Sequence, residues 1–173
     1  MSSTIFTPFT EEQLIPKEEK LEVLKKGKKF SIGIPKETCL HEKRLCITPD
    51  AVQVLVEHGH DIILEAGAGE GSFFTDLQFS EAGAQITTSQ AEVYGQDLVL
   101  KINPPTEEEM EFLKPNAYLV SALQINLRDK DYFKKLAEKK VNAIAFEFIM
   151  DEYRQLSLIR LIGEIAGGIS ILY

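Results

Sequence analysis

The chain has 173 residues, of which 44% are hydrophobic and 27% are charged, a composition typical of a globular protein. Its formal net charge of -8 argues against a nucleic-acid surface, because phosphate binding needs a basic face, and favours a small metabolite or a protein as partner. No apolar run approaches the roughly 18 residues that span a bilayer, and the N-terminus lacks a signal-peptide pattern, so we expect a cytoplasmic protein.

Residues 1–28 are expected to form an N-terminal arm ahead of the first strand. This segment runs into KKGKK and contains two prolines and the weakly helical stretch EEKLEVLKK. Its charged patches are either solvated or pack on a neighbouring subunit. We predict that residues 29–155 form the main domain and that residues 156–173 begin a further helix.

The main domain alternates between strand-like and helix-like runs. Strands are expected at residues 30–34, 61–65, 97–101, 118–123 and 141–146, with a short one at 84–87. Helices are expected between them, at residues 49–58, 76–82, 106–113 and 129–139. Strands such as DLVL and AYLVSAL are apolar throughout, which implies burial on both faces. The sequence therefore predicts an α/β fold, a parallel sheet with helices on both faces and right-handed crossovers.

Charged residues gather in the loop that follows the first strand. The run IGIPKETCLHEKRLCITP, residues 32–49, holds two acidic and three basic side chains, and Thr48 with Pro49 then starts a helix. In an open parallel sheet ligands bind at this carboxyl edge, where a guanidinium can hold a carboxylate or phosphate through two parallel hydrogen bonds. Arg44 is the first site candidate, with its guanidinium free for an anion. The alternative is a solvated loop in which Arg44 pairs with Glu37 or Glu42.

Other motifs favour structure over chemistry. The loop Gly67-Ala68-Gly69-Glu70-Gly71 follows a strand, but Ser72 takes the place of the third glycine of a dinucleotide fingerprint. We expect its glycines to supply positive φ for a tight turn. Cys39 and Cys46 are not spaced as a metal or redox pair and are expected to be reduced packing residues. No metal site is predicted, because nothing resembles a ligand cluster.

Several segments resemble one known family in order and spacing: IGIPKE, EKR-x-x-ITP, VEHGH, EAGAGEG, EAGA, DLVLK and EIAG. They are similar to the N-terminal domain of alanine dehydrogenases and of the alpha subunit of pyridine nucleotide transhydrogenase. The resemblance implies a flavodoxin-like parallel sheet beside a Rossmann domain, with residues 156–173 starting the connecting helix. It also implies NAD or NADP as cofactor, bound mainly by a missing C-terminal domain, a small 2-oxo or amino acid as substrate, and a homo-oligomer.

The resemblance assigns roles to four positions. Arg44 aligns with the family arginine that holds the carboxylate of pyruvate or alanine, for which lysine is no substitute. Asn103 stands where a family lysine contacts substrate, in a Lys-x-Lys-Glu-Pro motif. Gln124 replaces the catalytic histidine of a Leu-His pair, and an amide cannot exchange a proton near neutral pH. Gly163 stands where a serine contacts NAD.

Two branches of the family compete. Asn103 resembles the Lys-Val-Asn-Ala-Pro motif of transhydrogenase alpha subunits, in which this domain is a scaffold that binds partners, including a membrane-spanning subunit. Glu164 in EIAG favours the dehydrogenases, because transhydrogenases often carry Asn-Ile-Ala-Gly. We expect an NAD(P)-linked oxidoreductase closest to alanine dehydrogenase. A non-enzymatic phospho-receiver shares the order of elements, but it needs an aspartate at the end of its third strand, and Asp97 begins its strand instead.

Overall fold

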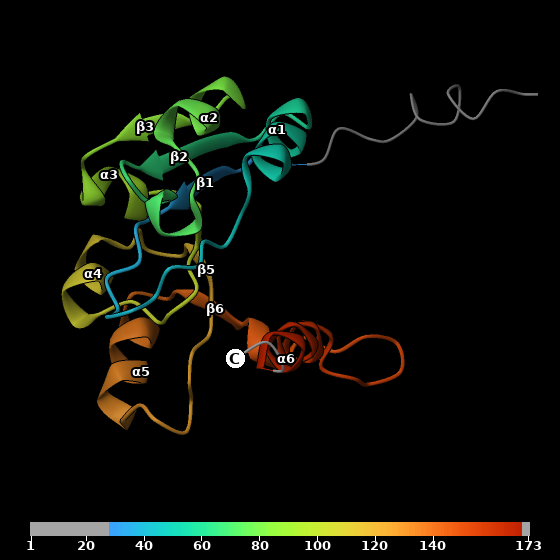
Figure 1. The fold of residues 1–173 in the computed structure, drawn as a ribbon. Coiled ribbons are helices and arrows are strands. Elements are labelled where there is room, and N and C mark those ends of the chain that lie inside the picture. The colour runs from blue at the N-terminus through green and yellow to red at the C-terminus, as the bar shows by residue number, and fades with distance from the viewer. Residues whose placement is uncertain (1–27, 171–173) are drawn as a thin grey trace, which may run out of the picture.

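The computed structural model describes residues 28–170 and shows a parallel sheet covered by helices (Figure 1). The strands are β1 (Ser31–Ile34), β2 (Asp61–Glu65), β3 (Gln85–Thr87), β4 (Leu98–Leu100), β5 (Tyr118–Ser121) and β6 (Asn142–Ala145). The helices are α1 (Pro49–Glu57), α2 (Asp76–Glu81), α3 (Gln90–Tyr94), α4 (Glu107–Phe112), α5 (Lys130–Glu138) and α6 (Ser157–Ser170), with 3₁₀ turns η3 (Glu70–Ser72) and η4 (Phe146–Phe148). The expected N-terminal arm, Lys28 apart, lies outside the described residues.

The six strands run in the order β3-β2-β1-β4-β5-β6, and every neighbouring pair is parallel. The predicted parallel α/β sheet is therefore confirmed. Without the short edge strand β3, the remaining five strands have the flavodoxin-like order. The chain moves outward from β1 to β2 and β3, then returns to β4 on the other side of β1. The carboxyl ends of β1 and β4 thus flank the topological switch point, where open sheets of this kind bind ligands.

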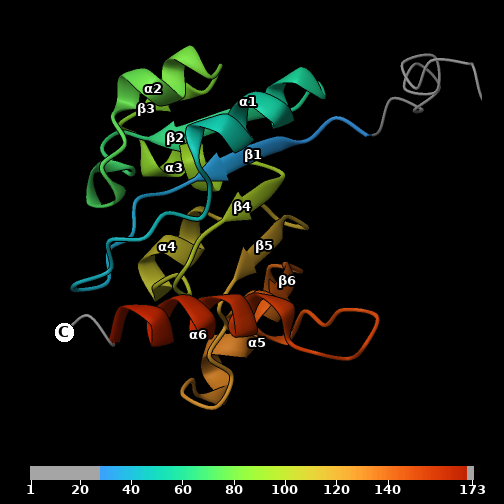
Figure 2. The same cartoon turned by 45° about the vertical axis from the view of Figure 1, so that its right-hand side comes forward.

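Two apolar cores explain why the strands are apolar throughout. In Figures 1 and 2, α1 and α2 lie on one face of the sheet and α3, α4 and α5 on the other. On the first face, Ile34 and Leu64 are buried in one cluster with Phe79 of α2. On the second face, Val99 and Leu119 are buried in another cluster with side chains of α3, α4 and α5. Both faces of the central strands are removed from water, as a sheet between two helical layers requires.

Helix caps fix where the loops at the carboxyl edge end. The hydroxyl of Thr48 accepts the backbone N–H of Ala51, and Pro49 occupies the first turn of α1. Thr106 and Glu109 form a reciprocal capping box at the start of α4. Both helix starts lie within one residue of their predicted positions, whereas α3, which has only five residues, was not predicted.

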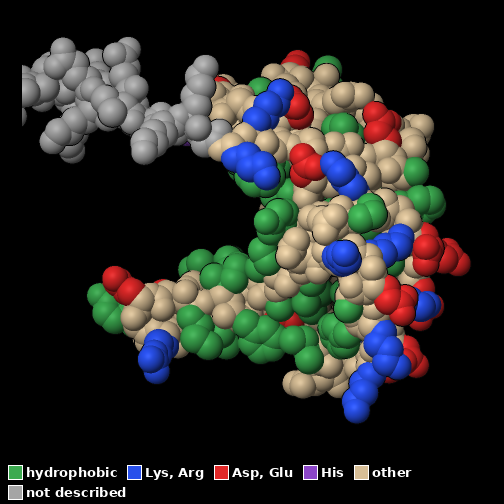
Figure 3. Space-filling view, turned by 180° about the vertical axis from the view of Figure 1, so that it is seen from behind, with side chains coloured by type: hydrophobic (Ala, Val, Ile, Leu, Met, Phe, Trp, Pro, Cys, Tyr) green, Lys and Arg blue, Asp and Glu red, His purple; other side chains and the backbone are tan. Residues whose placement is uncertain are grey.

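The last helix, α6, faces the ends of β4 and β5 through Leu158 and Ile162 and is otherwise open to solvent. None of its residues is buried, and its apolar side chains are exposed. Figure 3 shows this part of the chain projecting from the domain with apolar side chains along its surface. The helix predicted for the end of the chain is therefore present in its described part. None of the helices within residues 28–170 has the length and apolarity that a bilayer crossing requires.

Candidate functional site

The turn after β2 holds the loop that carries Arg44. The hydroxyl of Ser72 donates to the carbonyl oxygen of Lys43 at 2.7 Å. A Cβ atom on Gly71 would lie 2.8 Å from the same oxygen, so only glycine allows this approach. Gly67 has a φ of +72°, as expected for a tight turn, whereas Gly69 and Gly71 are not among the positive-φ residues. The expected role in positive φ is therefore wrong for Gly69 and Gly71, which are needed for close packing.

Arg44 is paired with Glu42. Its Nε and Nη2 atoms donate to the two carboxylate oxygens of Glu42 at 2.8 and 2.6 Å, and its backbone N–H donates at 3.0 Å. These bonds to Arg44 lower the pKa of Glu42 to about 2. The prediction of a free guanidinium is wrong, and the alternative pairing with Glu42 is confirmed, because two residues of one loop close the pair locally. The Arg44 side chain is still 57% exposed, so it faces solvent.

Asn103 joins the loop after β4 to the loop after β1. Its Nδ2 atom donates to Glu42 at 3.1 Å and to Glu37 at 3.4 Å. The structure thus brings Asn103 and Arg44 together through one carboxylate. They meet across the switch point between β1 and β4.

A buried ion cluster lies beneath these loops. Lys101 is 2% exposed, and its ammonium lies 3.3 Å from Glu109 and 3.6 Å from Glu37. Glu37 also accepts the backbone N–H of Ile102 at 2.6 Å, and Glu109 accepts the hydroxyl of Thr38 at 3.1 Å. The cluster therefore ties the loop after β1 to β4 and α4. Residue spacing did not indicate this cluster.

Gln124 lies just beyond β5 in a left-handed conformation, with a φ of +50°. Its backbone N–H and that of Leu123 donate to the carboxylate of Glu147 at 2.9 and 3.2 Å. A non-glycine residue in this region costs roughly 1 kcal/mol or more, and such strain clusters at functional sites. Glu147, which follows β6 in the turn η4, thereby holds Gln124 in place. Glu147 was not predicted as a site residue, although it too lies at a strand's carboxyl end.

Asn103 and Gln124 line one pocket of about 230 Å³. Thr38, Cys39, Thr106 and Arg128 also line it. The guanidinium carbon of Arg128 lies 5.2 Å from the ring centroid of Tyr132 on α5. Arg128 was not predicted as a site residue, although its place between β5 and α5 puts it at the carboxyl edge.

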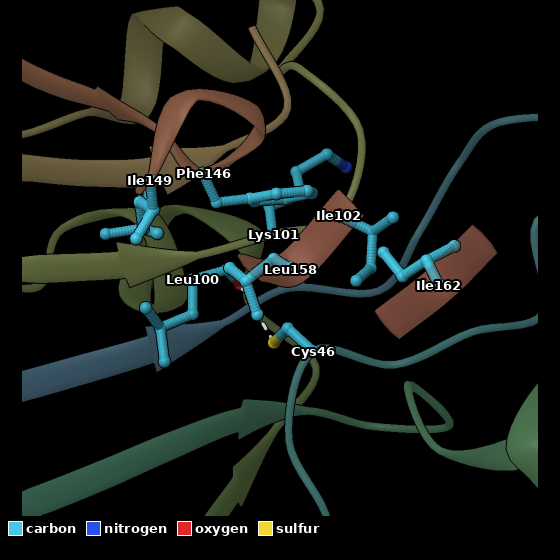
Figure 4. A pocket seen from close by; sticks show the side chains of 9 residues that line it. Cys46, Leu100, Lys101, Ile102, Phe146, Ile149, Leu158 and Ile162 are labelled. Atoms are coloured by element: carbon cyan, nitrogen blue, oxygen red, sulfur yellow. Dashed lines mark hydrogen bonds between the residues drawn. The ribbon is translucent and has the colours of Figure 1, made fainter. Parts of the chain in front are cut away.

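A second, apolar pocket of about 240 Å³ lies between α6 and the ends of β4 and β5 (Figure 4). Cys46 lines it, its Sγ atom 3.4 Å from the carbonyl oxygen of Leu100, and burial raises its pKa to about 12. The expected packing role therefore fits Cys46 but is wrong for Cys39, which is exposed.

Gly163 lies on α6 in open space, where an added Cβ would meet no atom within 4 Å. It does not line the pocket of Asn103 and Gln124. The described residues contain no metal-binding group of three or more His, Cys, Asp or Glu side chains.

Comparison with known proteins identifies the family. The family described as alanine dehydrogenase/PNT, N-terminal domain, matches residues 33–166. Alanine dehydrogenase from Staphylococcus saprophyticus is 41% identical over 139 residues, which cover 80% of this chain and 37% of that protein. Alanine dehydrogenase 2 from Staphylococcus aureus strain USA300 is 38% identical over 141 residues, covering 82% and 38%.

Solved structures give the same result. The structure of an L-alanine dehydrogenase matches with a TM-score of 0.71 and 30% sequence identity. The match covers 75% of this chain and 36% of the chain of that structure. The transhydrogenase from Sinorhizobium meliloti has a TM-score of 0.64 and 26% identity, with coverage of 70% and 36%. The chain spans little more than a third of the length of these relatives. The chain belongs to the alanine dehydrogenase and pyridine nucleotide transhydrogenase family, whose N-terminal domain it contains.

Proposed function

We propose that this chain is the substrate-side domain of an NAD(P)-linked oxidoreductase that resembles alanine dehydrogenase, which converts L-alanine to pyruvate and ammonia. One observation carries the proposal: Arg44, Asn103 and Gln124 all follow the carboxyl ends of strands around the switch point. Arg44 and Asn103 share Glu42, and Asn103 and Gln124 share a pocket. A substrate carboxylate would reach Arg44 by sharing or displacing the carboxylate of Glu42.

The described residues do not fit a dinucleotide. The glycine turn after β2 opens into the short turn η3 rather than a long helix, and the backbone of Lys43 fills the space beside Gly71. A phosphate site would need free backbone N–H groups at a helix N-terminus. We therefore assign NAD or NADP, which supplies hydride transfer, to a domain outside the described residues. Gly163 on α6 is proposed to lie toward that cofactor.

The two amides limit the chemistry. Oxidation of an amino acid needs a group that accepts a proton, and a positioned acid or base contributes about 10²–10⁴-fold. Gln124 can orient a substrate oxygen by hydrogen bonding but cannot take up its proton. Asn103 presents a neutral amide where the family has an ammonium, which weakens electrostatic stabilisation of the transition state. We expect slow oxidation of L-alanine, with the loss in kcat.

Restoring the family residues tests the proposal. In the full-length protein, the double change Asn103→Lys with Gln124→His should raise NADH production from L-alanine by about 10²-fold, the lower end of a typical acid/base contribution. A matched control, Asn142→Lys with Gln53→His, makes the same changes at exposed positions outside the pocket. Fast turnover by the wild type that stays level or falls in the double variant would show that other residues perform the chemistry.

The alternative function is that of a transhydrogenase alpha subunit, which moves hydride between NADH and NADP. The similarity to the Sinorhizobium meliloti structure and the amide at Asn103 favour it. In that case the domain serves as scaffold, and the exposed apolar side chains of α6 contact another copy or a membrane-spanning subunit. Hydride transfer from NADH to an NADP analogue without any amino acid, together with a partner retained in membrane fractions, would favour this function over the dehydrogenase.

A further inference from the structure

The pocket beside Asn103 contains a cation that lacks an acidic partner. Arg44 is held by Glu42, and Lys101 is held by Glu37 and Glu109. Among residues 28–170, Arg128 forms no ion pair; the residue is exposed, and its guanidinium lies over the ring of Tyr132. A guanidinium presents several donors in a planar fork that matches a carboxylate. Arg128 is thus the guanidinium at this edge whose donors are free for a ligand.

Gln124 supplies a second free polar group on the same pocket. Its backbone is bound to Glu147, whereas its side-chain amide has no hydrogen-bond partner among the described residues. The bonds to Glu147 hold this residue at the pocket wall in its strained conformation, with a φ of +50°. An amide can donate to a carboxylate oxygen without any change of protonation. The residue that cannot act as a base is therefore suited to binding.

The acidic groups near the pocket are already bound. Glu109 accepts from Lys101, from the hydroxyl of Thr38 and from the backbone N–H of Thr106 at 2.8 Å. Glu37 forms an ion pair with Lys101 and accepts hydrogen bonds from two backbone N–H groups.

Beside Arg128, the carboxylate of Asp129 caps α5, and Glu107 pairs with Lys135. Each of these carboxylates therefore already has a donor or a cation as partner, and Arg128 is the unpaired charge at the pocket wall. An anionic group is the complementary ligand.

We propose that this pocket binds the distal carboxylate of a dicarboxylic 2-oxo acid or amino acid, with Arg128 as its bidentate partner and the Gln124 amide as a further donor. The inference rests on the proposed function, in which Arg44 binds the first carboxylate. Asn103 lies between the two subsites, because it contacts Glu42, the partner of Arg44, on one side and lines the pocket on the other. The pocket, of about 230 Å³, has room for several water-sized groups.

The test compares two acids of equal chain length. 2-Oxoglutarate and 2-oxopentanoate differ only in a distal carboxylate or methyl group, and their binding to the full-length protein is measured by calorimetry with and without NADH. The wild type should bind 2-oxoglutarate about 10- to 100-fold more tightly, as for a charge-assisted hydrogen-bonded pair. Arg128→Met should abolish this preference. Arg128→Lys should keep part of it, because it retains the charge but not the planar fork.

Lys130→Met is the matched control, since it removes the same charge two positions away on the exposed start of α5. It should retain the full preference, and thermal unfolding of every variant should match the wild type. Equal binding of the two acids, binding of neither, or a preference that survives Arg128→Met would overturn the inference. Failure of the proposed function gives a different result. In that case neither acid oxidises NADH in the presence of ammonia, although the protein still prefers to bind 2-oxoglutarate.

Discussion

Replacing Lys101 with methionine should destabilise the domain more than any other single loss of a lysine charge at this edge. The Lys101 side chain is 1% exposed, and those of Glu37 and Glu109 are 6% exposed, so methionine would leave two buried carboxylates without their ammonium. Breaking a buried ion pair by removing one partner costs about 3–5 kcal/mol. Both carboxylates keep backbone donors, which places the expected loss near the lower value, about 3 kcal/mol.

Thermal unfolding measures this loss. For a domain of this size about 3 kcal/mol corresponds to a fall in Tm of roughly 6–12 °C. Lys114→Met is the control, because Lys114 and Asp97 form an exposed pair, with side chains 52% and 45% exposed, whose loss should cost less than about 1 kcal/mol. Adding Glu109→Gln to Lys101→Met should recover part of the stability by removing one uncompensated charge. The buried cluster has no structural role if Lys101→Met costs as little as Lys114→Met.

Two further predictions concern titratable groups. Burial raises the pKa of Cys46 from 9.0 to about 12, so its thiolate fraction near neutral pH falls about 10³-fold. Mass spectrometry after brief alkylation should therefore find exposed Cys39 modified and Cys46 protected until urea is added; equal modification of both would contradict this. The pKa of Glu42 is lowered to about 2, so its pairing with Arg44 stabilises the fold above pH 4.5, and this contribution is lost as the pH falls towards 2. The Tm difference between wild type and Glu42→Gln should be constant from pH 5 to 8 and shrink below pH 4.5; a difference that grows in acid would refute the pairing.

The succession of strands and helices along the chain could be predicted because the local signals are strong. Buried apolar runs indicate the strands. The helix start at Thr48 and Pro49 can be recognised from these two neighbouring residues alone, as an N-cap followed by a proline in the first turn. The five-residue helix α3 is too short to show a helical period, so only its cap at Ser89 could have indicated it. The pairing of Arg44 with Glu42 was visible as an alternative, since residues two apart in one loop can meet whatever the fold.

Contacts between distant segments could not be predicted from spacing. Lys101 meets Glu37 only after β1 and β4 become neighbours in the sheet. Glu147 reaches Gln124 only because β6 pairs with β5. The sequence shows which residues follow strands. Because the carboxyl ends of parallel strands lie at one edge of the sheet, these residues can be placed at that edge. Which side chains then contact one another depends on the order of the strands within the sheet, and the sequence pattern does not specify that order.

The amide at position 103 offers an electrostatic reason why the guanidinium of Arg44 is occupied. Three carboxylates, Glu37, Glu42 and Glu109, share two cations, Lys101 and Arg44, so the cluster has one negative charge in excess. The Nδ2 atom at position 103 already lies within hydrogen-bond distance of two of these carboxylates. A lysine there would balance the charge and compete with Arg44 for Glu42, which would free the guanidinium for a substrate carboxylate. With asparagine, Glu42 remains bound to Arg44. The change Asn103→Lys should therefore lower the KM for a 2-oxo acid even where Gln124 still prevents proton transfer, and an unchanged KM would show that Glu42 does not control access to Arg44.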